Sequence, residues 1–258
     1  MSGRLMHSIG ILSCNNKNTN VLRDIFGTCI RGVKQVLFPV FCIDCAHEGS
    51  VLCQYCQKKI SISGVFFCPG CREPSPQGHA CTPCKKTDVL DQHVALFVYG
   101  DKSPVVSQLI EIYKYQFEEE VCDIFRVWIQ TFFEEHMGVY DGSISCIVPV
   151  PLHKKRFAER GFNQSAALAT ALSDILDVPV VSLLSRGKHT KQQARLKKEE
   201  REENVKGAFH IVPGEGVYEH VLLVDDVFTT GSTMRACARA LRSAGVAKVS
   251  GWSLARGE

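Results

Sequence analysis

Long apolar runs are absent from this sequence, in which no stretch reaches the roughly 20 residues that a membrane-spanning helix requires. A cleavable secretory signal is also missing, because the first 20 residues contain Arg4, His7 and the polar run at 15–18. We therefore expect a cytoplasmic protein without a membrane span. The 45% content of apolar residues still predicts a packed core, and 258 residues suffice for one α/β domain and a smaller module.

Excess charge is scarce as well. The 30 Lys and Arg residues nearly balance the 27 Asp and Glu residues, and a formal charge of +3 is too small to identify a partner. The charge is concentrated at residues 186–206, where eight basic residues are mixed with four glutamates and no Phe, Tyr or Trp occurs. This composition predicts a solvated segment, and its lack of aromatic rings weakens the case for stacking on single-stranded DNA.

Cysteine, in contrast, is abundant: the chain has 13, and eight of them fall between residues 42 and 84. These eight form four pairs with two residues between the partners, a spacing that lets both thiolates of a pair bind one metal ion. Residues 41–86 are rich in glycine and proline and poor in large aliphatic side chains, so this stretch needs an internal cross-link to stay folded. We predict two structural zinc ions held by Cys42, Cys45, Cys53, Cys56, Cys68, Cys71, Cys81 and Cys84.

The spacing of the cysteines leaves two points open. Thiolates alone do not select the metal, so an iron–sulfur cluster is the alternative to zinc. Neighbouring pairs close the shortest loops, which favours the first two pairs around one ion and the last two around the other. A nested or interleaved arrangement is the alternative. In either arrangement four thiolates fill the coordination shell, so the metal is expected to be structural, and a reducing compartment fits.

Beyond the Cys-rich stretch the hydrophobic periodicity predicts alternating strands and helices. We expect strands at residues 94–99, 144–150, 178–184, 221–225 and 246–254, and helices at residues 21–38, 105–133 (one long or two short), 163–176 and 233–244. Strands separated by single helices imply right-handed crossovers and a mostly parallel sheet flanked by helices. The expected organisation is an N-terminal arm with an amphipathic helix (1–38), a small Cys-rich module (39–88) and an α/β domain (89–258).

Two adjacent acids follow an apolar strand in VLLVDDVFTTGST, residues 221–233. Asp225 and Asp226 are expected at the carboxyl end of the strand, where sheets of this kind bind ligands. The next residues combine hydroxyl groups, a glycine and the start of a helix, and these features together can bind an anion. Carboxylates beside an anion loop suit a sugar phosphate, although two acids can also simply end a strand. The predicted anion loop is Thr229, Thr230, Gly231, Ser232 and Thr233.

A basic segment follows the strand predicted at residues 144–150. In VPVPLHKKRFAERGFNQS, residues 148–165, the side chains of Lys154, Arg156 and Arg160 precede Gly161 and a helix that begins near Asn163. Cationic side chains at the end of a strand can neutralise a diphosphate. The alternative is a charged surface loop without a ligand.

These motifs resemble those of known families. VLLVDDVFTTGST looks like the phosphoribosyl pyrophosphate signature of type I phosphoribosyltransferases. Together with VPVPLH, RGFNQ, TKQQARLKKEEREENVKGAF and the leading cysteine pairs, it resembles the ComF family, also called competence protein F or GntX-like, from Phe38 to Arg256. The resemblance implies an α/β fold of the type I phosphoribosyltransferase kind, with a mostly parallel sheet, preceded by a double zinc ribbon.

The resemblance also implies roles for individual residues. Asp225 and Asp226 would hold the ribose hydroxyls of magnesium-bound phosphoribosyl pyrophosphate, and the loop at 229–233 would hold its 5′-phosphate. Lys114 in the segment IYKY would complete the site, although Tyr113 stands where many relatives have leucine. Residues 188–205 would form a flap over the phosphates, with a solvated charged helix as the alternative. The flap residues singled out are Lys191, Gln193 and Arg195.

The expected function is therefore transfer of a phosphoribosyl group with release of pyrophosphate, for which Asp225 and Asp226 are the candidate catalytic residues. Loss of pyrophosphate would leave an oxocarbenium-like centre for attack by a nitrogen nucleophile, which nothing in the sequence identifies. The alternative function is a non-catalytic module that binds single-stranded DNA or a helicase partner during DNA uptake. The resemblance alone supports the context of competence and DNA uptake.

Overall fold

The computed structural model describes residues 39–115, 119–187, 205, 207–213 and 218–257. The chain divides into two compact units, residues 1–53 and 54–258. In the described part of the first unit, an antiparallel bridge between Phe41 and Glu48 closes a tight turn. Among the described residues, no helix combines the length and the apolar character needed to cross a membrane.

Short elements and turns make up the beginning of the second unit. Four of these elements precede the α/β region: α2 (Gln54–Gln57), β1 (Val65–Phe66), the 3₁₀ helix η1 (Pro76–Gly78) and α3 (Thr82–Lys85). Proline at the start of η1 and of α3 fits the first turn of a helix, because the missing proline N–H has no partner there in any case. The low content of regular structure agrees with the scarcity of large aliphatic residues in this stretch.

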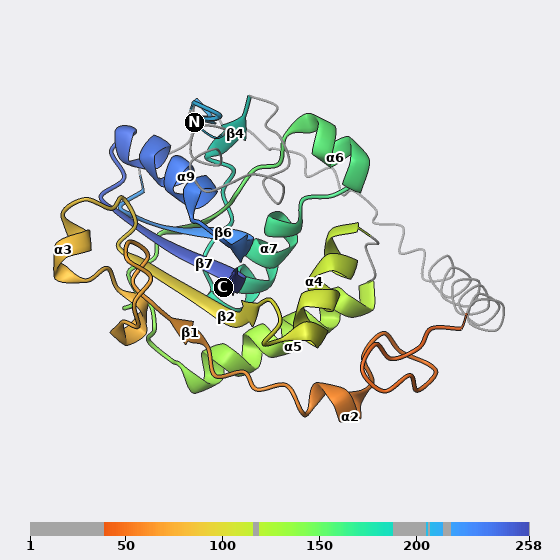
Figure 1. Cartoon of the computed structure of the whole chain (residues 1–258). Helices are drawn as coiled ribbons and strands as arrows, with labels where there is room; N and C mark the ends of the chain where they lie inside the picture. Colours follow the sequence, from red (N-terminus) through yellow and green to blue (C-terminus); the bar gives the residue numbers. More distant parts are fainter. Residues whose placement is uncertain (1–38, 116–118, 188–204, 206, 214–217, 258) are drawn as a thin grey trace, which may run out of the picture. The chain divides into compact units, whose positions relative to one another are not determined.

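A five-stranded sheet forms the centre of the second unit (Figure 1). Its order is β1, β2 (Gln92–Tyr99), β7 (Lys248–Gly257), β6 (His220–Phe228) and β3 (Cys146–Pro149). β2, β7, β6 and β3 run parallel to one another, and β1 is antiparallel to β2. Residues 221–224 of β6 are completely buried, as expected for a central parallel strand that is covered on both faces. The expected α/β fold with a mostly parallel sheet is confirmed.

Helices cover both faces of this sheet (Figure 1). One face carries α4 (Pro104–Tyr115), α5 (Glu119–Glu135) and α7 (Gln164–Leu176), and the other carries α9 (Ser232–Ser243). A two-stranded antiparallel ribbon, β4 (Leu184–Arg186) with β5 (Phe209–Ile211), joins the α9 side through one continuous apolar core. The short helix α6 (Lys154–Arg160) follows β3. This arrangement brings the carboxyl ends of β2, β3 and β6 to one cleft, which is lined by Tyr99, Val150 and Asp226.

Several predicted elements differ from the structure in informative ways. The strand expected at 178–184 is wrong: Val180 forms only an isolated bridge to Ile147, and the regular strand β4 begins at Leu184. Around this bridge the Pro179 carbonyl accepts from the Ile147 N–H and the Val181 N–H donates to the Ile147 carbonyl, and Leu183 and Leu184 then pack into the core beside α9. The stretch at 105–133 forms two helices, α4 and α5. The helix expected at 21–38 lies outside the described residues.

Candidate functional site

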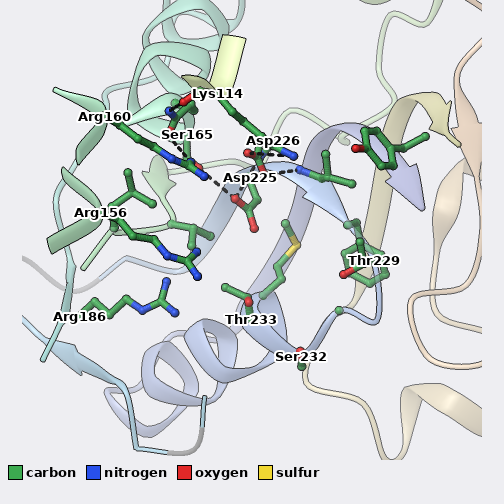
Figure 2. A pocket seen from close by; sticks show the side chains of 18 of the residues that line it. Lys114, Arg156, Arg160, Ser165, Arg186, Asp225, Asp226, Thr229, Ser232 and Thr233 are labelled. Atoms are coloured by element: carbon green, nitrogen blue, oxygen red, sulfur yellow. Dashed lines mark hydrogen bonds and ion pairs between the residues drawn. The ribbon is translucent and has the colours of Figure 1, made fainter. Parts of the chain in front are cut away.

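A cleft of about 330 Å³ opens at the carboxyl end of β6 (Figure 2). Its volume lies in the range of about 300–1,000 Å³ typical of small-molecule sites. The acids Asp225 and Asp226 occupy one wall, and Arg156 and Arg160 of α6 occupy another. The turn between β6 and α9 completes the lining. Structure therefore brings together segments that are more than 60 residues apart in the sequence, namely α6 and the end of β6.

Asp225 is held by a neighbour on another element. Ser165, in the first turn of α7, donates a hydrogen bond from Oγ to Asp225 Oδ1 at 3.0 Å, and the Asp226 N–H donates to the same oxygen at 2.9 Å. Burial, and next the charge of Asp226, raise the pKa of Asp225 to about 7. Asp225 can thus carry a proton near neutral pH.

Lys114 supplies the positive charge beside the acid pair. Its Nζ lies 3.9 Å from Asp226 Oδ2 and 3.2 Å from Glu111 Oε1, and its side chain is only 15% exposed. Burial acts to lower the pKa of Lys114, but Asp226 and then Glu111 outweigh burial and raise it. Tyr99 donates a 2.6 Å hydrogen bond to Glu111 Oε1, the oxygen that Lys114 also contacts, and thereby holds the Glu111 carboxylate in place. Lys114, expected from the resemblance, therefore lies at the cleft.

The turn after β6 has the geometry of an anion site. β6 extends to Phe228, so the two acids lie within the last residues of the strand, and Gly231 then takes a left-handed φ of 76° before α9 begins. A Cβ at Gly231 would lie 2.5 Å from the Phe228 ring, so glycine is required there. Backbone N–H groups and the helix dipole at the start of α9 favour a bound anion.

Most of the predicted anion loop borders the cleft. Thr229, Gly231, Ser232 and Thr233 line it, whereas Thr230 lines a second cavity on the other side of the turn. The Thr230 and Ser232 hydroxyls lie 2.9 Å apart and are hydrogen-bonded, so Thr230 shapes the turn from behind.

The basic wall comes from a helix that the sequence analysis did not expect. The His153 ring accepts a hydrogen bond from the Lys155 N–H at 3.2 Å and caps α6, and Gly161 ends the helix with a left-handed φ of 78°. Arg156 and Arg160 are four residues apart, so both project from one face of α6 into the cleft. Lys154 and Gly161 are not among the residues that line it.

Arg160 and Arg186 connect this wall to other elements. Arg160 donates to the Gln164 side chain at 2.9 Å, and Gln164 in turn donates to the Lys114 carbonyl at 3.1 Å. Arg186, on β4, lines the cleft next to Arg156 (Figure 2). Burial, and then the neighbouring Arg156, lower the pKa of the Arg186 guanidinium. The basic wall therefore concentrates positive charge that a bound anion would neutralise.

Sequence reasoning missed Ser165 and Arg186 as site residues. Ser165 stands in the quoted motif RGFNQS, and Arg186 begins the basic segment at 186–206. Both residues therefore lie in motifs that the sequence indicated, but the sequence does not show that their side chains face the cleft. The predicted flap residues Lys191, Gln193 and Arg195 lie outside the described residues.

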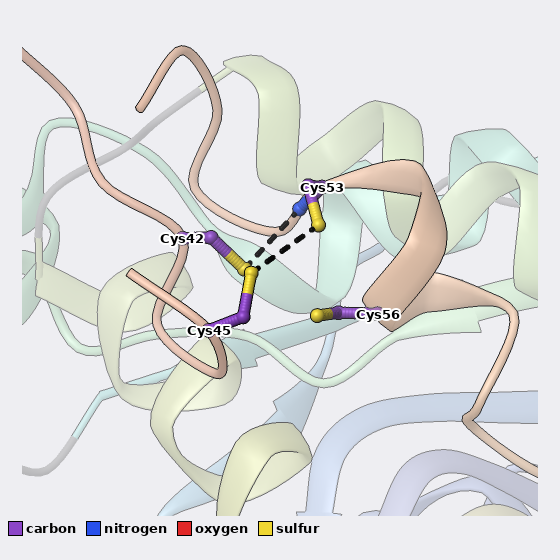
Figure 3. A group of neighbouring side chains, drawn as sticks. All are labelled: Cys42, Cys45, Cys53 and Cys56. Carbon is purple, nitrogen blue, oxygen red and sulfur yellow. Dashed lines mark hydrogen bonds between the residues drawn. The ribbon is translucent and has the colours of Figure 1, made fainter. Parts of the chain in front are cut away.

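The eight paired cysteines gather into two groups of four. The first group is Cys42, Cys45, Cys53 and Cys56 (Figure 3), and the second is Cys68, Cys71, Cys81 and Cys84. Neighbouring pairs are therefore combined, which confirms the pairing that the sequence favoured. Within each group all four sulfur atoms lie within 4.8 Å of one another.

The sulfur geometry fits a tetrahedral metal site. Cys45 and Cys53 Sγ are 3.6 Å apart, and Cys81 Sγ lies 3.7 Å from Cys68 Sγ and 3.8 Å from Cys71 Sγ. A tetrahedral zinc with Zn–S bonds of 2.3 Å requires sulfur separations of about 3.8 Å. Both groups can thus bind zinc, which would cross-link two turns of a stretch that has little apolar core.

Two of these thiols are poised to lose their protons. Burial acts to raise the pKa of Cys42 and of Cys68, but backbone N–H groups outweigh burial and lower each pKa to about 6. The strongest of these donors are the N–H groups of Cys53 and Cys81, which lie in the partner pair of each group. The folded backbone therefore favours the thiolate form that binds a metal ion.

Comparisons with known proteins agree with this architecture. Residues 163–256 match the family model described as phosphoribosyl transferase domain. The chain is 30% identical over 226 residues to competence protein F of Haemophilus influenzae. That alignment covers 79% of this chain and 96% of the relative. It is 31% identical over 214 residues to DNA utilization protein YhgH of Escherichia coli K12, and that alignment covers 81% of this chain and 91% of the relative.

A further relative is competence protein ComFC of Bacillus subtilis, which is 28% identical over 213 residues, or 80% of this chain and 84% of that protein. Each of these matches covers about four-fifths of this chain. Identity at this level over nearly the full length of relatives, joined to a phosphoribosyl transferase domain and two Cys₄ groups, identifies the family. The chain belongs to the ComF, or competence protein F, family.

Proposed function

We propose that the protein binds magnesium-bound phosphoribosyl pyrophosphate in the cleft at the end of β6 and transfers its phosphoribosyl group. The observation that carries the proposal is the convergence of three features on one cleft: the acid pair, the anion loop before α9 and the arginines of α6. A ribose with a 5′-phosphate and a 1′-diphosphate presents the three complementary groups in one molecule.

The acid pair is assigned to the ribose. Asp225 and Asp226 accept hydrogen bonds from the 2′- and 3′-hydroxyls, and the Ser165 bond keeps Asp225 Oδ1 in place for this contact. The anion loop, from Thr229 to Thr233, accepts the 5′-phosphate through backbone N–H groups and hydroxyls. Magnesium that arrives with the substrate would supply positive charge to the diphosphate oxygens.

The basic wall is assigned to the leaving group. When the bond between C1 and the diphosphate oxygen breaks, its electron pair leaves with pyrophosphate, and Arg156 and Arg160 stabilise the added negative charge. The positive charge that develops at the ribose is stabilised by the nearby acid pair. A nitrogen nucleophile then forms the new bond to C1 and loses a proton, for which Asp225 is a candidate acceptor because its pKa is raised to about 7.

The names of the relatives support a biological context for the proposed activity. Two of them are called competence proteins and one a DNA utilization protein. We propose that this chain likewise acts in competence and the use of DNA. Binding of single-stranded DNA or of a helicase partner by the basic segment at 186–206 is the alternative for the same context.

Calorimetric titration of the full-length protein with phosphoribosyl pyrophosphate and magnesium tests the proposal. We expect saturable heat with one site per chain, and slow pyrophosphate release once a suitable amine is present. The control is Asp174→Asn, which changes an exposed carboxylate that pairs with Arg126 on the surface. Absence of binding by folded wild-type protein would reject the proposal.

A DNA-binding assay separates the alternative. If the protein acts only as a DNA-binding module, replacing Lys197, Lys198 and Arg201 by alanine abolishes salt-dependent DNA binding, and replacing both acids by asparagine leaves it unchanged.

A further inference from the structure

The second cysteine group lies directly behind the predicted phosphate loop. The two are linked by arginines rather than by apolar packing alone, and the links run from each of the two cysteine turns. One turn contains Cys68 and Cys71, and the other contains Cys81 and Cys84. Both turns belong to the same compact unit as the cleft.

The first link is Arg72, which follows Cys71. Its Nη2 donates to the carbonyl of Thr229 at 2.7 Å and to the carbonyl of Gly257 at 3.0 Å. Arg72 has a left-handed φ of 69°, and its N–H donates to the Cys68 carbonyl at 2.9 Å. The conformation that aims this side chain at Thr229 is therefore part of the cysteine turn itself.

The second link is Arg235, in the first turn of α9. Its guanidinium donates to the Thr230 carbonyl at 2.7 Å, to the Pro69 carbonyl and to Asp88 Oδ2 at 2.8 Å. Pro69 lies between two of the cysteines, and the Asp88 N–H donates to the Cys84 carbonyl at 2.8 Å. Arg235 thus joins the loop to both cysteine turns.

Both arginines hold the loop through hydrogen bonds to its carbonyl groups. With the carbonyls of Thr229 and Thr230 directed toward the cysteine group, the peptide planes on this side of the turn have a fixed orientation. In a turn of this kind the orientation of the peptide planes decides whether the N–H groups converge on an anion. A loop that lost these anchors would have to be ordered by the ligand, at a cost in affinity.

We propose that the second cysteine group, acting through Arg72 and Arg235, positions the phosphate loop, so that metal loading of Cys68, Cys71, Cys81 and Cys84 sets the affinity for a sugar 5′-phosphate. This inference rests on the proposed function and adds a second role for the metal beyond stabilising its own turns. Arg72 and Arg235 are positioning residues, because neither lines the cleft.

The test uses Arg72 variants of the full-length protein and ribose 5-phosphate as the probe. We expect Arg72→Ala to raise Kd about tenfold while zinc content stays at the wild-type value, and Arg72→Lys to recover part of the loss. The matched control is Arg239→Ala, an exposed arginine on α9 that lines the cavity behind the loop, and it is expected to leave Kd unchanged.

Hydrogen exchange of residues 229–233 gives a second readout that needs no ligand. Arg72→Ala is expected to speed exchange there, and Arg239→Ala is not. Cys71→Ser, which removes one ligand of the second group, is expected to raise Kd and speed exchange in the loop more than Cys45→Ser, which makes the same change in the first group. Hydrogen exchange in the rest of the chain also shows whether each variant remains folded.

The outcomes distinguish this inference from the proposed function. If wild-type protein binds ribose 5-phosphate and Arg72→Ala binds it equally well with unchanged exchange, the positioning role is rejected and the function stands. If wild-type protein does not bind ribose 5-phosphate, the function is contradicted, and exchange in the loop still decides whether Arg72 holds it. Equal exchange in wild type and Arg72→Ala would reject the link.

Discussion

The two walls of the cleft are built differently. The acid wall sits on a central strand, and each carboxylate has a partner on a neighbouring helix: Ser165 for Asp225 and Lys114 for Asp226. The basic wall sits on the seven-residue helix α6 and the short strand β4. Burial lowers the pKa of Arg156 and of Arg186, and a neighbouring arginine adds to each effect: Arg160 for Arg156, and Arg156 for Arg186. The acid wall is thus organised in advance, whereas the basic wall concentrates like charges that favour an anionic ligand.

The largest expected effect comes from neutralising the acid wall. The double variant with Asp225→Asn and Asp226→Asn is expected to lose affinity for ribose 5-phosphate and for phosphoribosyl pyrophosphate alike, by on the order of 100-fold, because both ligands use the ribose hydroxyls. Calorimetry measures both constants. The Asp174→Asn control should bind both ligands as wild type does, and equal binding by the double variant would contradict the assignment of the acids.

Removing one arginine of the basic wall should change the affinities for the two ligands by different factors. Arg156→Ala is expected to weaken phosphoribosyl pyrophosphate about 30-fold with little change for ribose 5-phosphate, since only the former carries a diphosphate. Arg126→Ala, which removes an exposed arginine of α5, is the control. Equal losses for both ligands would mean that Arg156 contacts the sugar or the 5′-phosphate instead.

Lys114 tests the connection between the acids and their counter-charge. Lys114→Met removes a charge that helps to lower the pKa of Asp225 against burial, so we expect that pKa to rise and affinity at pH 7 to fall about tenfold. The loss should diminish at higher pH, where Asp225 ionises in any case. Lys114→Arg keeps the charge and should lose less. A loss that is independent of pH would point to a direct contact between Lys114 and the ligand.

The smallest effect concerns stability. Because burial raises the pKa of Asp225 from 3.8 to about 7, the folded protein holds this proton more tightly than the unfolded chain, so the free energy of unfolding falls as pH rises from about 4 to about 7. Asp225→Asn should remove this pH dependence. Because Asp225 is partly exposed to solvent, we expect the change in the free energy of unfolding to be on the order of 1 kcal/mol. Urea unfolding at several pH values measures it, and an unchanged slope would contradict the assigned shift.

Sequence patterns predicted those parts of the molecule that depend on neighbours along the chain. The spacing of the cysteines indicated two groups of four, and VLLVDDVFTTGST indicated a buried strand, an acid pair and an anion loop. Asn163 was expected to open a helix, and it caps α7 by accepting a hydrogen bond from the Ser165 N–H. Each of these features is local, so residue type and spacing carry most of the information.

Other features could not be read from local patterns. The segment at 154–160 was interpreted as a basic loop, yet its cap and its closing glycine make it the helix α6. The strand expected at 178–184 pairs with β3 only at Val180, and Leu183 and Leu184 pack into the core beside α9. In both cases the surroundings, rather than periodicity, selected the conformation.

The sequence by itself determined the metal-binding spacing, most of the strands and helices of the main sheet and the chemical groups at the end of β6, because these follow from residues close together in the chain. Only the tertiary structure decided which partners surround those groups. The Ser165–Asp225 bond joins residues 60 apart and the Arg72–Thr229 bond residues 157 apart. Their side-chain directions depend on how helices and turns pack on the sheet, a property of the whole fold rather than of any segment.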